Sequence, residues 1–81
     1  MTPDELVRMA RCRDMTSNGR ARAIRETARL SLAELALACG VDEGTLSRWE
    51  RGHRRPRAAV ALRYLAVLDA LERGAATGVK A

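Results

Sequence analysis

Residues 31–52 contain two helix-start signals, each followed by a glycine at a helix-end position, and this alternation restricts the segment to short helices joined by a tight turn. Ser31-Leu32-Ala33-Glu34 is a capping box, in which serine and glutamate satisfy each other's backbone N–H groups at a helix start. Gly40 suits the left-handed position that ends such a helix. Asp42 is typical of the N-cap of a following helix, which Gly52 ends. The spacing predicts a helix-turn-helix unit over residues 31–52.

The rest of the chain also has helical spacing and no strand alternation, so we expect an all-α fold. Thr2-Pro3-Asp4-Glu5 is another start signal, and Thr16-Ser17-Asn18-Gly19 breaks the helix that follows it. One domain is expected over residues 1–74, with a flexible tail over 75–81. Its helices are predicted over Pro3–Asp14, about 20–29, Leu32–Ala38, Asp42–Arg51 and Pro56–Arg73.

The charge of the chain points to a polyanionic partner. Its 81 residues carry 15 basic and 10 acidic side chains, a net charge of +5, and they contain one Trp, one Tyr and no Phe. A chain of this size holds one small core, built here from aliphatic side chains. Basic charge of this strength favours nucleic acid as the partner. The densest stretch lies between Arg48 and Arg57, where Glu50 is the one acidic residue.

Other classes of protein are excluded by what the sequence lacks. No apolar run is long enough to span a bilayer, and the first residues do not form a secretory signal. Cys12, Cys39 and His53 do not have zinc-ligand spacing, and we expect two reduced thiols in a cytoplasmic protein. No grouping of nucleophile, base and acid suggests an enzyme. We therefore expect no cofactor, metal, membrane or small-molecule ligand.

The side chains between the two short helices have the pattern of a helix-turn-helix core. A small residue, Ala36, lies where the helices are expected to cross, and Leu35, Val41, Leu46 and Trp49 are spaced to point between them. The second helix is then left with one outward face. That face consists of Glu43, Gly44, Ser47 and Arg48, with Thr45 at its margin.

These residues resemble the XRE family, the group of phage repressor and Cro proteins. The resemblance lies in the run Leu30–Ala36, in Gly40-Val41, in Thr45–Gly52 and in Arg55-Pro56, and it covers about residues 20–71. It implies a compact, lambda-repressor-like bundle of four or five helices. Such a bundle binds double-stranded DNA as a two-fold dimer, to repress or control transcription. The chain is thus expected to be a small phage or mobile-element regulator of the repressor or Cro type.

The resemblance also implies roles for single residues. Glu43, Gly44 and Arg48 occupy base-reading positions, although Glu43 can alternatively serve only the helix dipole. Arg25 is expected to pair with Glu50 and hold the recognition helix in place. Leu32 stands where the family usually has a glutamine that contacts phosphate, so that anchor is missing. Contacts to DNA phosphates are expected from Thr45, Arg51, Arg54, Arg55 and Arg57, and additionally from Arg20 and Arg22.

The last predicted helix carries more apolar surface than one small core needs. Val60, Tyr64, Val67 and Leu71 form one stripe, which we expect to be a homodimer interface. Two alternatives remain open. The extra N-terminal helix, residues 3–14, would cover this stripe within one chain. Or the stripe over residues 60–71 would dock a different protein, making the chain an interaction module such as an antitoxin or accessory factor.

Overall fold

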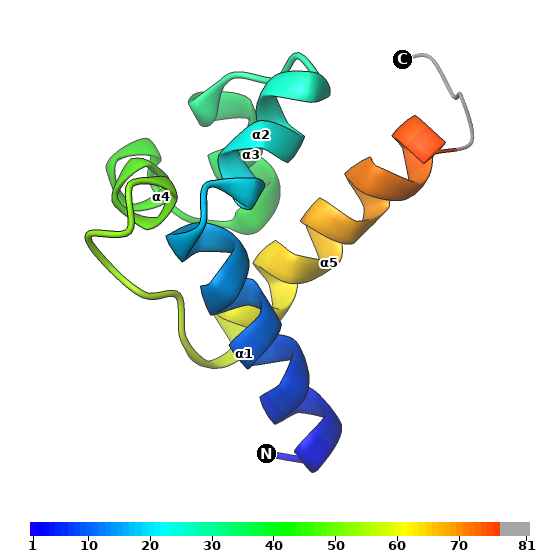
Figure 1. Ribbon diagram of the computed structural model, residues 1–81. Helices are drawn as coiled ribbons and strands as arrows, with labels where there is room; N and C mark the ends of the chain where they lie inside the picture. Colours follow the sequence, from blue (N-terminus) through cyan, green and yellow to red (C-terminus); the bar gives the residue numbers. More distant parts are fainter. Residues whose placement is uncertain (77–81) are drawn as a thin grey trace.

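Five helices and no strand make up residues 1–76, the part of the chain that the computed structural model describes (Figure 1). The all-α prediction is confirmed. In chain order the helices are α1 (Pro3–Ser17), α2 (Arg20–Thr27), α3 (Leu32–Cys39), α4 (Glu43–Glu50) and α5 (Ala58–Ala76).

Both predicted capping boxes are present. At the start of α1 the Glu5 N–H donates to Thr2 Oγ1 (3.1 Å), and the Thr2 N–H donates to Glu5 Oε1 (2.8 Å). Ser31 and Glu34 repeat the arrangement at the start of α3, at 3.0 and 2.9 Å. These hydrogen bonds satisfy backbone donors that a helix start would otherwise leave unpaired. The two helices therefore begin at the residues that the sequence indicated.

The two helices of the helix-turn-helix unit end in the same way. Gly40 and Gly52 both have φ +73°, a conformation that side-chain-bearing residues rarely adopt. Beyond them, the Val41 N–H donates to the Ala36 carbonyl (3.1 Å) and the His53 N–H donates to the Arg48 carbonyl (2.9 Å). These are the long hydrogen bonds of a Schellman motif, and they turn the chain sharply after α3 and after α4.

The structure corrects the predicted limits of the outer helices. Helix α1 continues to Ser17, because Asn18 and Gly19 form the break. Helix α5 begins at Ala58 rather than at Pro56, whose ring is buried. It also passes Gly74 and ends at Ala76, so two residues of the predicted tail are helical. The remainder of that tail, residues 77–81, lies outside the described residues.

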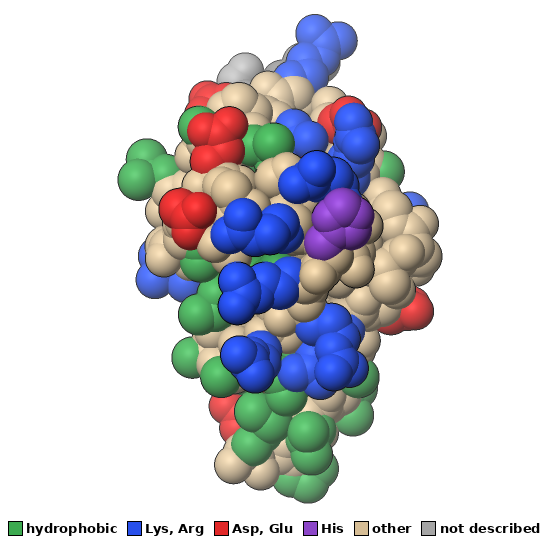
Figure 2. Space-filling view, turned by 90° about the vertical axis from the view of Figure 1, so that its left-hand side faces the viewer, with side chains coloured by type: hydrophobic (Ala, Val, Ile, Leu, Met, Phe, Trp, Pro, Cys, Tyr) green, Lys and Arg blue, Asp and Glu red, His purple; other side chains and the backbone are tan. Residues whose placement is uncertain are grey.

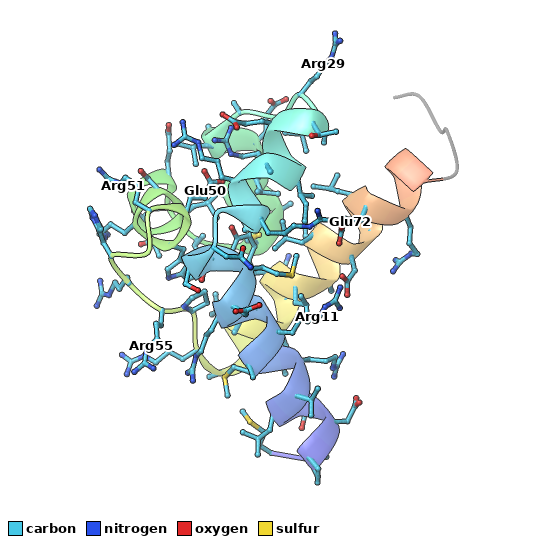
Figure 3. All side chains as sticks on the ribbon, in the orientation of Figure 1. Arg11, Arg29, Glu50, Arg51, Arg55 and Glu72 are labelled. Atoms are coloured by element: carbon cyan, nitrogen blue, oxygen red, sulfur yellow. The ribbon has the colours of Figure 1, made fainter. Side chains whose placement is uncertain are left out.

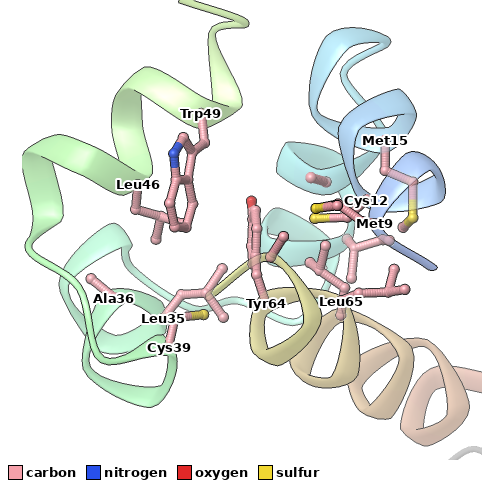
Figure 4. Packing of buried hydrophobic residues seen from close by; sticks show 14 residues of the cluster. Met9, Cys12, Met15, Leu35, Ala36, Cys39, Leu46, Trp49, Tyr64 and Leu65 are labelled. Atoms are coloured by element: carbon pink, nitrogen blue, oxygen red, sulfur yellow. The ribbon is translucent and has the colours of Figure 1, made fainter. Parts of the chain in front are cut away.

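The core joins the helix-turn-helix unit to α1 and α5 through one aromatic pair. The rings of Trp49 and Tyr64 stack with their centroids 5.1 Å apart, and Leu35 and Leu46 are buried on the same side. On the other side of Tyr64, Figure 4 shows α1 contributing Met9, Cys12 and Met15. A single Trp and a single Tyr are enough because aliphatic and sulfur-containing side chains fill the rest of this small volume.

The predicted dimer stripe on α5 is wrong in its central residue. Tyr64 is 0% exposed, because α1 packs along α5 and encloses it within one chain. Val67 and Leu71 are half-buried against the same core, and only Val60 is exposed. The alternative, in which the N-terminal helix covers the stripe, is the arrangement observed.

No described helix is long and apolar enough to cross a bilayer. Among the same residues, no group of three or more His, Cys, Asp or Glu side chains lies close enough together to hold a metal ion.

The two cysteines are buried free thiols, so their reactivity toward a thiol reagent should indicate whether the core is packed. Burial raises the pKa of Cys12 and of Cys39 to about 11. Both thiols should stay protonated at pH 8, and the thiolate is the nucleophile. We expect negligible reaction of the native chain with a thiol reagent at that pH, and full reaction in denaturant. Native thiols that react as fast as denatured ones would contradict the packing of α1 on the core.

The hydroxyl of Tyr64 is buried and has no hydrogen-bond partner among the described residues. Burial also raises the pKa of this phenol, so the hydroxyl stays protonated and unpaired near neutral pH. We expect Tyr64→Phe to raise the free energy of unfolding by about 1 kcal/mol, because the substitution removes an unpaired polar atom. Urea titration of the native chain and the variant measures this difference in the free energy of unfolding. Tyr64→Leu, which loses the stack on Trp49, should be destabilising, and a Phe variant equally unstable would disprove the explanation.

Candidate nucleic-acid interface

Helix α4 exposes one continuous face to solvent. Leu46 and Trp49 are buried against α3 and α5, which leaves the residues on the opposite side outward. Glu43 and Gly44 are exposed and Ser47 is half-buried, and the structure brings them together with Arg48 on this face. The four residues predicted to read bases therefore share one surface. A helix of this kind fits the major groove of duplex DNA through its outward face.

Arg48 does not extend into solvent in this state. Its guanidinium lies back over the first turn of α4, where Nη2 donates to Thr45 Oγ1 at 3.4 Å, and Nε is buried without a partner among the described residues. A β-carbon built on Gly44 would lie 3.5 Å from Arg48 Nη1. That is an ordinary van der Waals distance, and the tighter approach, 3.1 Å, would be to Asp42 Oδ2. An arginine with an unpaired buried nitrogen gains hydrogen bonds when it extends to an acceptor.

The first turn of α4 is held by Asp42. Thr45 donates to this carboxylate through its hydroxyl (2.5 Å) and its backbone N–H (3.1 Å). The side-chain hydrogen bond from Thr45 is the main cause that lowers the pKa of Asp42, and the charge of Arg48 adds to it. The Thr45 hydroxyl, predicted to contact phosphate, therefore already donates a hydrogen bond to Asp42 of the same chain.

The predicted pair of Arg25 and Glu50 joins α2 to α4. Nε of Arg25 lies 2.6 Å from Oε2 of Glu50, and Nη2 lies 3.0 Å from Oε1, with 12% and 4% of the two side chains exposed. The remaining Nη1 donates to the Leu30 carbonyl at 2.9 Å. The hydrogen bond to Glu50 is the main cause that raises the pKa of Arg25. Glu50 is thereby removed from the charge balance of the surface.

Beyond α4 the chain forms an arginine loop, which we define as residues 51–57. Its four arginines are exposed, and none forms an ion pair within the described part of the chain. Arg51 and Arg55 point away from the body of the protein (Figure 3). Figure 2 shows Lys and Arg side chains gathered on this face, with the single histidine, His53, among them. The arginines are Arg51, Arg54, Arg55 and Arg57.

Several arginines of α1 and α2 pair with acids. Arg20 pairs with Glu72 of α5. Arg22 is exposed and lies 3.4 Å from Glu26, one turn along α2. The guanidinium of Arg20, which was expected to contact phosphate, is thus paired with an acidic residue distant in sequence.

Arg13 of α1 is a positioning residue that the sequence did not reveal. Its Nε donates to the Pro56 carbonyl at 3.0 Å, which ties the arginine loop to α1. Beside this contact, α1 and the loop border an open groove of about 300 Å³. Nothing in the helical pattern distinguished Arg13 from the other arginines of α1. The groove is lined by Ala10, Arg13, Asp14, Thr16, Ser17, Gly52, Arg54 and Arg55.

A family model described as helix-turn-helix matches residues 22–73, more than half of the chain. The chain belongs to the XRE family of helix-turn-helix DNA-binding proteins. It is accordingly a DNA-binding transcription regulator of the XRE type, with duplex DNA as its partner. No curated protein and no solved structure matches it significantly. The matched region begins within α2, so α1 lies outside the part that the XRE model describes.

Leu32 differs from the glutamine that the XRE family usually has at this position. Leu32 is the first residue of α3 and packs, half-buried, against the core instead of offering a polar group to DNA. Of the three base-reading positions that the resemblance implies, two carry charged side chains, Glu43 and Arg48, and the third is Gly44.

A double-mutant cycle should show strong energetic coupling between Arg25 and Glu50. We expect Arg25→Met or Glu50→Leu alone to lower the free energy of unfolding by about 3–5 kcal/mol, because each leaves a buried charge without its partner. The double variant should cost much less than the sum of the two. Urea titration of the four proteins gives the coupling energy. Simple additivity would show that the pair does not orient α4.

Proposed function

We propose that this XRE protein is a small repressor of the Cro type, from a phage or another mobile element, and that α4 reads a specific sequence in the major groove. The observation that supports this most directly is the separation of charge. The arginines after α4 form no ion pair within the described residues, whereas those on α1 and α2 pair with acids, apart from Arg13, which donates to the Pro56 carbonyl. The proposed activity is binding in the cytoplasm, not catalysis.

The two groups of residues would act differently on DNA. Arg48, with Glu43, Gly44 and Ser47, would contact base edges, and an arginine on guanine O6 and N7 is worth about 1–3 kcal/mol of discrimination. Arg51, Arg54, Arg55 and Arg57 would contact phosphates, which position the protein without reading sequence.

One α4 helix covers only a few base pairs, so we infer that two copies bind a site with dyad symmetry. Two recognition helices of a symmetric dimer fit half-sites centred about 34–36 Å apart, one turn of B-DNA. The rival function, docking of another protein on residues 60–71, has less support because Tyr64, Leu65 and Leu68 are buried within the chain.

Base reading and phosphate binding can be separated with two substitutions on duplexes selected from random DNA. Arg48→Ala should relax the preference at one base position, by about 1–3 kcal/mol. Arg54→Ala should weaken all duplexes alike and reduce the slope of log affinity against log salt by about 1.

The matched control is Arg29→Ala, which removes one exposed arginine at the tip between α2 and α3, remote from the arginine loop (Figure 3). It should leave specificity and salt slope almost unchanged. If Arg48→Ala and Arg54→Ala weaken every duplex equally, or if no sequence is preferred over random DNA, the proposed function is wrong.

A further inference from the structure

Three arginines meet in the open groove between α1 and the arginine loop. Its lining includes Arg13 of α1 and Arg54 and Arg55 of the loop, and its one acidic residue is Asp14. None of the three arginines forms an ion pair within the described part of the chain. The groove therefore carries an excess of positive charge that these residues do not neutralise.

Arg13 differs from the other two arginines of α1, because it has no acidic partner within the described residues. Arg8 and Arg11 lie 3.5 and 2.9 Å from the carboxylates with which they pair. Arg13 is half-buried, and its Nε donates to the Pro56 carbonyl at 3.0 Å. Its two terminal nitrogens make no hydrogen bond to another described residue. A partly buried guanidinium in this situation is stabilised by an anion that binds those nitrogens.

The arginine loop is held against α1 in a constrained conformation. The Pro56 ring is buried while its carbonyl accepts the hydrogen bond from Arg13. Two residues later, Ala58 has φ +56°, in the left-handed region that side-chain-bearing residues rarely adopt. Such a conformation costs free energy and persists only where the surrounding structure fixes it. The fold itself thus sets the position of the loop arginines relative to Arg13.

The guanidinium groups are the donors that remain available in this groove. The hydroxyl of Thr16 donates to the Arg13 carbonyl at 2.9 Å, and the hydroxyl of Ser17 donates to the Asp14 carbonyl at 3.0 Å. Both hydroxyls are therefore used within α1. Guanidinium groups bind phosphate oxygens through paired, charge-assisted hydrogen bonds. A contact of this kind adds affinity for nucleic acid without reading its sequence.

The groove also adjoins the end of the recognition helix. Gly52, which turns the chain after α4, is part of its lining. Figure 2 shows the Lys and Arg side chains of this face gathered on one surface. When a recognition helix lies in the major groove, the phosphates that border that groove pass beside the helix ends. A phosphate at the end of α4 would lie within reach of the three arginines.

We propose that α1 is part of the DNA interface, and that its groove with the arginine loop binds a backbone phosphate of the duplex. In this site Arg13 contacts the phosphate together with Arg54 and Arg55, and the charge of Asp14 opposes the contact. The inference rests on the proposed function and extends it. The region that matches the family supplies the two loop arginines, whereas Arg13 comes from a helix outside that region.

Two equal losses of charge on α1 test the role of Arg13, on duplexes selected with the native chain. Arg13→Gln should bind selected and random duplexes about tenfold more weakly. It should also reduce the slope of log affinity against log salt by about 0.9, the value for one phosphate contact. The matched control is Arg8→Gln, which removes the same charge from the same helix outside the groove and should change neither quantity. Equal effects of the two variants would overturn the proposal.

Neutral methylphosphonates, placed singly along the duplex backbone, show whether Arg13 touches the duplex or only holds Pro56. At one position beside the site of α4, the native chain should lose about tenfold in affinity. Arg13→Gln should lose clearly less there, because its share of the contact is already gone. An arginine that only positioned the loop would give equal losses for both proteins at every position, and that result would exclude the contact.

Asp14→Asn tests the groove without breaking any contact of the folded chain. The Asp14 side chain forms no ion pair or hydrogen bond within the described residues. Removing its charge should strengthen binding to the selected duplex by about two- to threefold at low salt. Asp4→Asn makes the same change at the other end of α1 and should strengthen binding less. Equal gains would mean that only net charge matters, contrary to the proposal.

The outcomes separate this inference from the proposed function. If the native chain prefers its selected duplexes while the α1 variants behave like their controls, the groove does not bind DNA and the proposed function stands. A native chain that prefers no duplex refutes both. Inorganic phosphate, at the ionic strength of a chloride buffer, should displace the duplex no more than chloride does. Stronger displacement from the native chain but not from Arg13→Gln would identify a site for free phosphate and reject the DNA assignment.

Discussion

The orientation of the recognition helix depends on one buried guanidinium. Arg25 binds Glu50 of α4 through two nitrogens and the Leu30 carbonyl through the third, so one side chain connects α2, the segment before α3, and α4. Glu50 is buried and the Arg25 side chain is 12% exposed, so separating the two would leave a charge in a poorly solvating environment. A different angle of α4 would break this pair. The same pairing removes Glu50 from the DNA-facing surface, so that orientation and surface charge are set together.

The distribution of the remaining charges follows from which acids the fold brings near which arginines. Asp69 and Glu72 of α5 pair with Arg11 and Arg20, although they lie about fifty residues away in sequence. The arginine loop receives no such partner within the described residues. A modest net charge is thereby concentrated on one face. Phosphate binding depends on this local excess, since exposed charges more than a Debye length apart are largely screened.

Helix α1 extends the XRE fold in two ways. Its inner side completes the core around Tyr64 and, through Arg13 and Pro56, holds the arginine loop. Its outer side is apolar and unpartnered in the single chain. A chain with so few aromatic residues gains core volume from Met9, Cys12 and Met15 without another large ring. This addition encloses Tyr64, the central residue of the α5 stripe, within one chain.

The sequence by itself determined the features that depend on a few neighbouring residues. The capping boxes, the left-handed turns at Gly40 and Gly52 and the inward positions of Leu46 and Trp49 are local, so the five helices and the outward face of α4 could be predicted. The pair of Arg25 and Glu50 was predicted from the resemblance to the XRE family. Only the tertiary structure decided that α1 encloses Tyr64, that Arg20 turns to Glu72 and that Arg13 holds Pro56. Those outcomes depend on which of several competing partners lies nearest after the helices pack, and no periodicity along the chain encodes that distance.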